Sequence, residues 1–154
     1  MLARLHRTAL EHLGVRAQPK VTGRRGIQVW VPIARGPSFA ETRAWAEQLS
    51  KAVGKVVPEL VSWKWEVERR GGQARLDYTQ NAVNKTLVAP YSPRPAPGAP
   101  VSMPISWDEL DQIYPTDFTL HTAPDRLDVT GDPWARMLEQ RQDLGAIIGA
   151  GSSA

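Results

Sequence analysis

The chain has 154 residues, 42% hydrophobic and 23% charged, a composition typical of a globular domain. It contains no cysteine, which excludes disulfides, thiolate metal sites and cysteine nucleophiles, and it has no apolar run long enough to span a membrane. The net charge of +3 permits a polyanionic partner without requiring one, and the default expectation is a soluble cytoplasmic protein.

The N-terminal third is predicted to contain two helices and a strand. Apolar residues recur at helical spacing over residues 2–13, and Gly14 ends that pattern. No N-cap residue precedes this helix, so we expect a segment upstream of it to be missing or dispensable. A glycine-flanked turn at Thr22–Gly26 leads into an alternating strand over 27–31. A Ser-x-x-Glu capping box then opens a helix over 38–53.

The clearest strand pattern lies in the middle of the chain. Residues 61–67 alternate apolar and polar side chains, Gly71-Gly72 suits a tight turn, and residues 74–79 alternate again. This predicts a hairpin whose polar face presents Asp77. The expected fold class is α/β (α+β), with a mostly antiparallel sheet built around this hairpin and helices packed on one face.

The C-terminal part is predicted to hold short elements around a proline-rich stretch. A short strand is expected near residues 86–88, and residues 90–104 are expected to be extended and stiff. A flexible tail is predicted over 145–154, which leaves residues 1–144 as the folded domain. Helices are predicted to open at Ser106, near Thr122, and over 134–144 after an Asp-Pro cap.

Two places could carry chemistry. The Thr22–Gly26 loop combines glycines, a hydroxyl and arginines, which can bind a phosphate, although a glycine-bearing loop alone is usually an ordinary turn. Asp77, followed by Thr79 and Gln80, could hold a hard cation such as Mg²⁺, although a single aspartate is usually just solvated. A polar run that ends at Arg94 is a third, weaker candidate.

Four segments taken together resemble a known family. In order, they are residues 19–29 (PKVTGRRGIQV), 76–81 (LDYTQN), 85–94 (KTLVAPYSPR) and 97–110 (PGAPVSMPISWDEL). This series resembles the polymerase domain of bacterial ligase D, a member of the archaeo-eukaryotic primase superfamily. The resemblance runs from about Leu2 to Leu138.

The resemblance implies a nucleotidyltransferase that adds nucleotides to DNA 3′ ends during non-homologous end joining. It implies a Mn²⁺ or Mg²⁺ cofactor in the complete domain, held by three carboxylates, of which Asp77 matches the third. The implied partners are DNA ends, a nucleotide triphosphate, a separate or fused DNA ligase and the Ku end-binding protein. The implied nucleotide- and phosphate-binding residues are Thr22, Gly23, Arg25, Gln28, Gln80 and Arg94, and the implied DNA-binding residues are Lys20 and Arg24.

The sequence departs from the family pattern in informative ways. Thr22 stands for the usual serine and keeps a hydroxyl, and Arg25 stands for lysine and keeps a cation. Gln28 stands for histidine; it can donate a hydrogen bond but cannot carry a charge. The family's Asp-x-Asp would precede the first helix, and the sequence contains none. We therefore expect the chain not to polymerise alone. The alternatives are one part of a split or truncated gene, a non-catalytic DNA- or nucleotide-binding module, and a non-functional remnant. We also expect Asp77 to face the Thr22–Gly26 loop.

Overall fold

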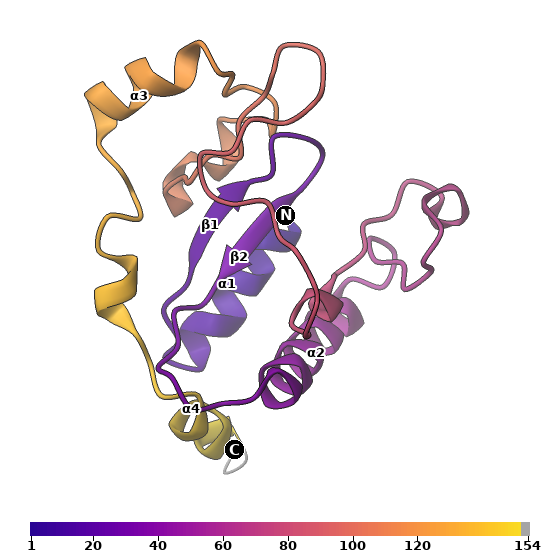
Figure 1. Cartoon of the computed structure of the whole chain (residues 1–154). Coiled ribbons are helices and arrows are strands. Elements are labelled where there is room, and N and C mark those ends of the chain that lie inside the picture. The colour runs from indigo at the N-terminus through magenta and orange to yellow at the C-terminus, as the bar shows by residue number, and fades with distance from the viewer. Residues whose placement is uncertain (152–154) are drawn as a thin grey trace. The chain divides into compact units, whose positions relative to one another are not determined.

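The computed structural model describes residues 1–151, and its side chains are described as far as residue 148. The described chain forms two compact units, each drawn as a ribbon in Figure 1. Unit 1 consists of Met1–Leu13, Arg35–Thr86 and the segment from Leu144 onward, and unit 2 consists of Gly14–Ala34 and Leu87–Asp143.

Unit 1 is built on two helices. Helix α1 (Leu2–His12) is the expected amphipathic helix, and Gly14 follows it with a φ of +66°. Helix α2 (Phe39–Val56) begins at the predicted capping box, in which Ser38 and Glu41 satisfy each other's backbone N–H groups. The two helices contact each other, and apolar side chains of α1 pack on a core formed by Val53, Val61 and Leu76.

The predicted hairpin over residues 61–79 does not form. Val61 and Ala74 make a single isolated bridge, and the rest of the segment contains the short 3₁₀ turns η1 (Val67–Arg70) and η2 (Tyr78–Gln80). An alternating sequence forms a strand when one face is buried against a partner. Here Trp63 and Trp65 retain 46% and 61% of their exposure, so burial does not stabilise an extended ladder.

The end of the chain contains one more helix. Helix α4 (Leu144–Gly151) begins with a buried residue, Leu144, and lies over most of the predicted tail, whose flexibility stays a prediction. The remaining part of that predicted tail, residues 152–154, lies outside the described residues. No helix within residues 1–151 is both long enough and apolar enough to cross a membrane.

Unit 2 contains the one regular ladder in the described part of the chain. Strands β1 (Gln18–Val21) and β2 (Ile27–Trp30) pair antiparallel, with Gln18 opposite Trp30 and Val21 opposite Ile27. The predicted strand at 27–31 is confirmed, and the Thr22–Gly26 turn joins the pair. The fold class is therefore mixed helix and antiparallel sheet, as expected, but the sheet forms at β1–β2.

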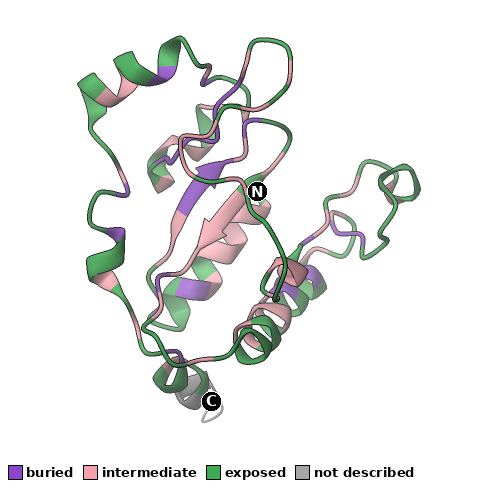
Figure 2. Ribbon diagram, viewed as in Figure 1, coloured by how far each residue is buried: buried purple, intermediate pink, exposed green. Residues whose placement is uncertain are grey.

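The end of the proline-rich stretch contributes to the core of unit 2. Residues 100–105 are buried, as part of the purple ribbon in Figure 2, and Val101, Met103 and Ile105 pack in one cluster with Val21 and Phe118. Isolated bridges join this stretch to Lys20 and to Thr119. The end of the expected stiff connection is thus internal, because backbone pairing satisfies its polar groups, whereas residues 90–99 are exposed or half-buried. The strand predicted at 86–88 is absent.

Short helical elements complete unit 2. The capping box at Ser106 opens the 3₁₀ turn η3 (Trp107–Asp111), and α3 (Thr122–Thr130) begins where a helix was expected. The helix predicted over 134–144 is wrong, since only the short 3₁₀ turn η4 (Met137–Gln140) and the first residue of α4 are helical there. Downstream, Gln142 pairs with the backbone of Pro32 and Ala34, which draws the chain into an extended path instead.

Candidate functional site

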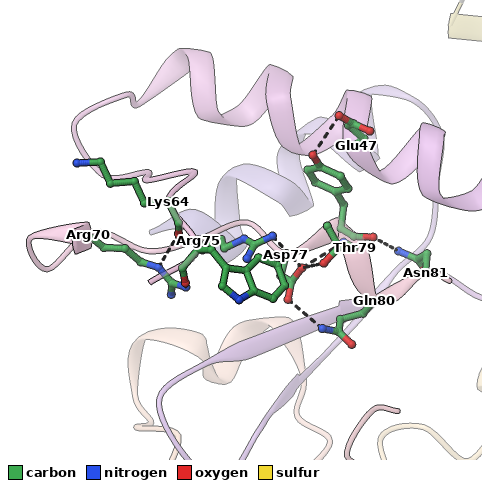
Figure 3. A network of polar contacts seen from close by, with 10 residues as sticks. Glu47, Lys64, Arg70, Arg75, Asp77, Thr79, Gln80 and Asn81 are labelled. Carbon is green, nitrogen blue, oxygen red and sulfur yellow. Dashed lines mark hydrogen bonds and ion pairs between the residues drawn. The ribbon is translucent and has the colours of Figure 1, made fainter. Parts of the chain in front are cut away.

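Asp77 lies in a local network of donors in unit 1, shown in Figure 3. Its Oδ1 accepts hydrogen bonds from the backbone N–H (3.1 Å) and the hydroxyl (2.5 Å) of Thr79, and its Oδ2 accepts one from Gln80 Nε2 (3.1 Å). Arg75 Nη2 lies 3.8 Å from Oδ1. Asp77 is thus the cap of η2, not a residue on a strand.

These partners keep the Asp77 carboxylate ionised. Burial raises the pKa of Asp77, but the hydrogen bonds from Thr79 and Gln80 and the charge of Arg75 outweigh it, so the pKa lies below its ordinary value. The side chain is still 37% exposed. An ionised, accessible carboxylate suits a cation ligand, although its oxygens already accept three hydrogen bonds.

Neighbouring side chains fix this network to the rest of unit 1. The guanidinium of Arg75 stacks over the ring of Trp65 at 3.9 Å. The hydroxyl of Tyr78 donates to Glu47 Oε1 on α2 (3.0 Å), and the ring of Tyr78 lies 6.4 Å from that of Trp63. The position of Asp77 therefore depends on α2 as well as on its own turn.

The described residues do not form a two-metal centre. Within that part of the chain, no group of three His, Asp or Glu side chains is arranged to hold a metal ion. Asp77 supplies one carboxylate, whereas a pair of divalent cations bridging phosphates needs several oxygen ligands. The residues present thus fit, at most, one ligand of the implied Mn²⁺ or Mg²⁺ site.

The Thr22–Gly26 loop in unit 2 is a closed turn. Thr22 N–H donates to the carbonyl of Gly26 (2.9 Å), and Gly26 N–H donates to Thr22 Oγ1 (3.2 Å). Gly23 has a φ of +68°, and a Cβ added there would stand 2.7 Å from Arg94 Cγ and 2.9 Å from the carbonyl carbon of Val101. Only glycine allows the loop to approach the Arg94 segment this closely.

Three arginines lie in or beside this loop. Arg94 is held by its backbone N–H, which donates to the carbonyl of Pro100 (2.7 Å), and its buried Nε has no hydrogen-bond partner. Arg24 and Arg25 are exposed, and Arg24 Nη2 donates to the carbonyl of Pro95 (2.9 Å). The predicted phosphate ligands Thr22, Gly23 and Arg94 therefore belong to one local cluster.

Two other predicted residues have different surroundings from those expected. Lys20 is fully buried, and its Nζ donates to the carbonyl of Val88 (2.9 Å) and to the hydroxyl of Ser102. The expected DNA contact does not fit this placement, because a backbone phosphate cannot reach an ammonium without exposed surface. Gln28 accepts a hydrogen bond from Trp30 Nε1 (3.2 Å) on the same strand, so part of its side chain is already engaged.

The predicted site residues thus form two groups. Asp77 and Gln80 lie in unit 1, and the Thr22–Gly26 loop with Arg94 lies in unit 2. The expectation that the two groups face one another stays a prediction. Sequence reasoning assigned no role to Ser102, which is hydrogen-bonded to Lys20 across 82 positions, and no local pattern signals such a long-range pair.

Known proteins are similar to this chain in sequence. Residues 1–134 match the family described as LigD, primase-polymerase domain. The multifunctional non-homologous end joining protein LigD of Pseudomonas aeruginosa is 34% identical over 144 residues, which cover 92% of this chain and 17% of that protein. The bifunctional LigD of Bacillus subtilis is 31% identical over 143 residues, which cover 90% of this chain and 23% of that protein.

A solved structure has a fold similar to that of this chain. The polymerase domain from Mycobacterium tuberculosis ligase D in complex with DNA superposes with a TM-score of 0.80 at 26% identity, covering 92% of this chain and 49% of that one. The chain therefore spans about half of that structure and less than a quarter of the two curated relatives. With its glycine loop and its Asp-x-x-Gln-Asn segment in the family order, the chain belongs to the LigD primase-polymerase domain family.

Proposed function

We propose that this chain is part of a primase-polymerase that transfers nucleotides from NTP or dNTP to DNA 3′ ends during non-homologous end joining. Unit 2 binds the triphosphate of the nucleotide through the Thr22–Gly26 loop and Arg94. Asp77 of unit 1 supplies one acidic ligand of the complete domain. The observation that carries the proposal is the close packing of Gly23 on Arg94, whose Nε is buried and lacks a partner.

A phosphate suits this cluster for physical reasons. The buried Nε is itself out of reach of a ligand, but the charge of a guanidinium is shared by its three nitrogens, so an oxyanion beside the rest of the group offsets the cost of burying it. Arg24 and Arg25 add positive charge at the exposed rim of the loop. An arginine can bind two phosphate oxygens at once, so Arg94 fixes the orientation of the phosphate and also supplies positive charge.

We further propose that the 154-residue chain does not extend DNA by itself. Phosphoryl transfer depends on positioning and on charge stabilisation around the phosphates, which a lone carboxylate does not provide. The additional carboxylates and the cation, Mn²⁺ or Mg²⁺, belong to the complete domain. A DNA ligase and the Ku protein are the partners proposed for the whole protein, and the cytoplasm is its proposed location.

A non-catalytic binding module is the second candidate. It is favoured by the engagement of the Asp77 carboxylate with Thr79 and Gln80, while the loop of unit 2 closes through its own hydrogen bonds. In this alternative the chain binds a nucleotide or DNA and does no chemistry.

Two assays test these proposals. In the first, the chain is incubated with Mn²⁺, labelled ATP or dATP and a recessed DNA end; we expect no extension. Extension that Asp77→Ala abolishes would overturn the proposed inactivity.

In the second assay, nucleotide binding is measured by calorimetry for the native chain, Arg94→Lys, Arg94→Ala and the matched control Arg43→Ala, which removes an exposed arginine from α2. We expect at least tenfold weaker binding for Arg94→Ala, partial recovery in Arg94→Lys, and no change for Arg43→Ala. Equal affinity in all four proteins would refute the phosphate site.

A further inference from the structure

Lys20 of β1 is a fully buried cation without an acidic partner. Its Nζ donates to the carbonyl of Val88 and to the hydroxyl of Ser102, both neutral acceptors. The Ser102 hydroxyl in turn lies 3.3 Å from the carbonyl of Val21, to which it donates. No carboxylate pairs with Lys20 among the described residues, so the ammonium is buried without a counter-ion.

Such a charge does not help the fold by itself. The two hydrogen bonds, and the Trp30 ring whose centroid lies 5.8 Å from Nζ, offset only part of the cost of burying a charge that has no opposite charge beside it, and an apolar side chain of similar size would cost less. Burial, followed by the positive charge of Arg94, lowers the pKa of Lys20 to about 8. The presence of the cation is therefore more readily explained by a negative ligand that is bound during function.

The place of Lys20 identifies where that ligand binds. Lys20 precedes Thr22 by two residues, and its acceptors Val88 and Ser102 lie before and after Arg94 in the chain. Val101, next to Ser102, is the residue whose backbone would meet a Cβ on Gly23 at 2.9 Å. Through these two hydrogen bonds the Lys20 ammonium connects β1 to residues that precede and follow Arg94, whose segment packs on the loop.

We propose that Lys20 is a positioning residue of the phosphate site, and that the phosphate bound by the Thr22–Gly26 loop and Arg94 is the missing counter-charge of its buried ammonium. This inference rests on the proposed function of the loop. Its consequence is that phosphate binding and protonation of Lys20 are coupled, although Lys20 does not contact the phosphate.

The coupling has a definite sign. A bound anion favours the charged ammonium, so the pKa of Lys20 is higher in the bound protein than in the free one. Anion affinity is therefore full below the pKa of the free protein, about 8, and falls as the pH rises above it. An upward shift of about one unit corresponds to roughly tenfold weaker binding at high pH.

The other charged groups around Lys20 do not mimic this effect. Arg94, Arg24 and Arg25 remain charged throughout this range. Tyr91, whose N–H donates to the carbonyl of Ser102, stays neutral because burial and the neighbouring Asp132 raise its pKa. Strand β2 contributes no ionisable side chain.

Sulfate is the appropriate probe, because its charge is constant between pH 7 and pH 10. Binding is followed by the NMR signal of the Thr22 methyl group, and Lys20 is titrated through its side-chain carbon signals with and without sulfate. We expect about tenfold weaker sulfate binding at high pH, and a Lys20 pKa about one unit higher when sulfate is bound. Lys20→Met should abolish the pH dependence, and the exposed Lys55→Met should retain it.

The outcomes separate the two proposals. Sulfate that binds at the loop with equal affinity at both pH values, and leaves the Lys20 titration unmoved, overturns this inference but not the phosphate site. Sulfate that does not perturb Thr22 at all overturns both. If Lys20→Met does not fold, the titration of Lys20 in the native chain decides.

Discussion

Gly23 is the position where one added methyl group tests the packing of the loop on the Arg94 segment. Its φ of +68° lies in the left-handed region, which costs an L-residue about 1–2 kcal/mol. The new Cβ would stand 2.7 Å from Arg94 Cγ, which can move, and 2.9 Å from the Val101 carbonyl carbon, which cannot move alone. Overpacking of this kind costs about 1–3 kcal/mol. We expect Gly23→Ala to lower the free energy of unfolding by about 2–5 kcal/mol.

Two glycines in the same unit serve as controls. Gly98 also has a positive φ, +78°, but nothing lies within 4 Å of its added Cβ, so Gly98→Ala isolates the backbone strain, about 1–2 kcal/mol. Gly26 lacks a positive φ, and its Cβ would meet only Thr22 atoms at 3.8 Å, so Gly26→Ala should change stability by less than about 0.5 kcal/mol.

The measurement is urea unfolding followed by tryptophan fluorescence, with the three variants beside the native chain. The difference between Gly23→Ala and Gly98→Ala gives the cost of the close approach to Val101. A Gly23→Ala protein no less stable than Gly98→Ala would show that the loop does not pack on this segment, and it would remove the structural basis of the phosphate site.

Three further predictions concern other contacts. Asp77→Asn should make the free energy of unfolding depend less on pH in the acid range, because a carboxylate with a lowered pKa stabilises the fold above about pH 4 and loses that contribution as the pH falls further. An unchanged acid transition in pH titrations carried out in urea would contradict this. Ser38→Ala should destabilise unit 1 by about 1 kcal/mol through loss of the capping box, measured by circular dichroism during urea unfolding, and equal midpoints would refute it. Tyr91→Phe removes the hydrogen bond to Asp132 and should cost about 1–2 kcal/mol in the same assay, where a native-like midpoint would show that the bond contributes nothing.

Sequence patterns predicted the structure correctly where the residues that form an element are close together in the chain. The capping boxes at Ser38 and Ser106 and the helix that ends before Gly14 depend on contacts within a few residues. The family likewise follows from motifs that each occupy a short stretch. These features require no knowledge of tertiary contacts.

The remaining features depend on partners far along the chain. The alternation over 61–79 predicted a strand pair, but its tryptophans stay exposed and the segment forms short 3₁₀ turns. The stretch at 90–104 was expected to be an extended, stiff connection, but its end, residues 100–104, is internal because its backbone pairs with β1 and Thr119. A periodic pattern specifies which faces are apolar, but not whether another segment covers them.

The sequence by itself thus determined the helix caps, the glycine turn and the family of this protein, because each resides in neighbouring residues. Only the tertiary structure decided that Lys20 is buried against Val88 and Ser102, and that Asp77 caps a turn instead of lying on a strand. The physical reason is that burial and hydrogen-bond partners depend on which distant segments meet. A charged residue that the sequence places at the surface can therefore be buried in the folded protein.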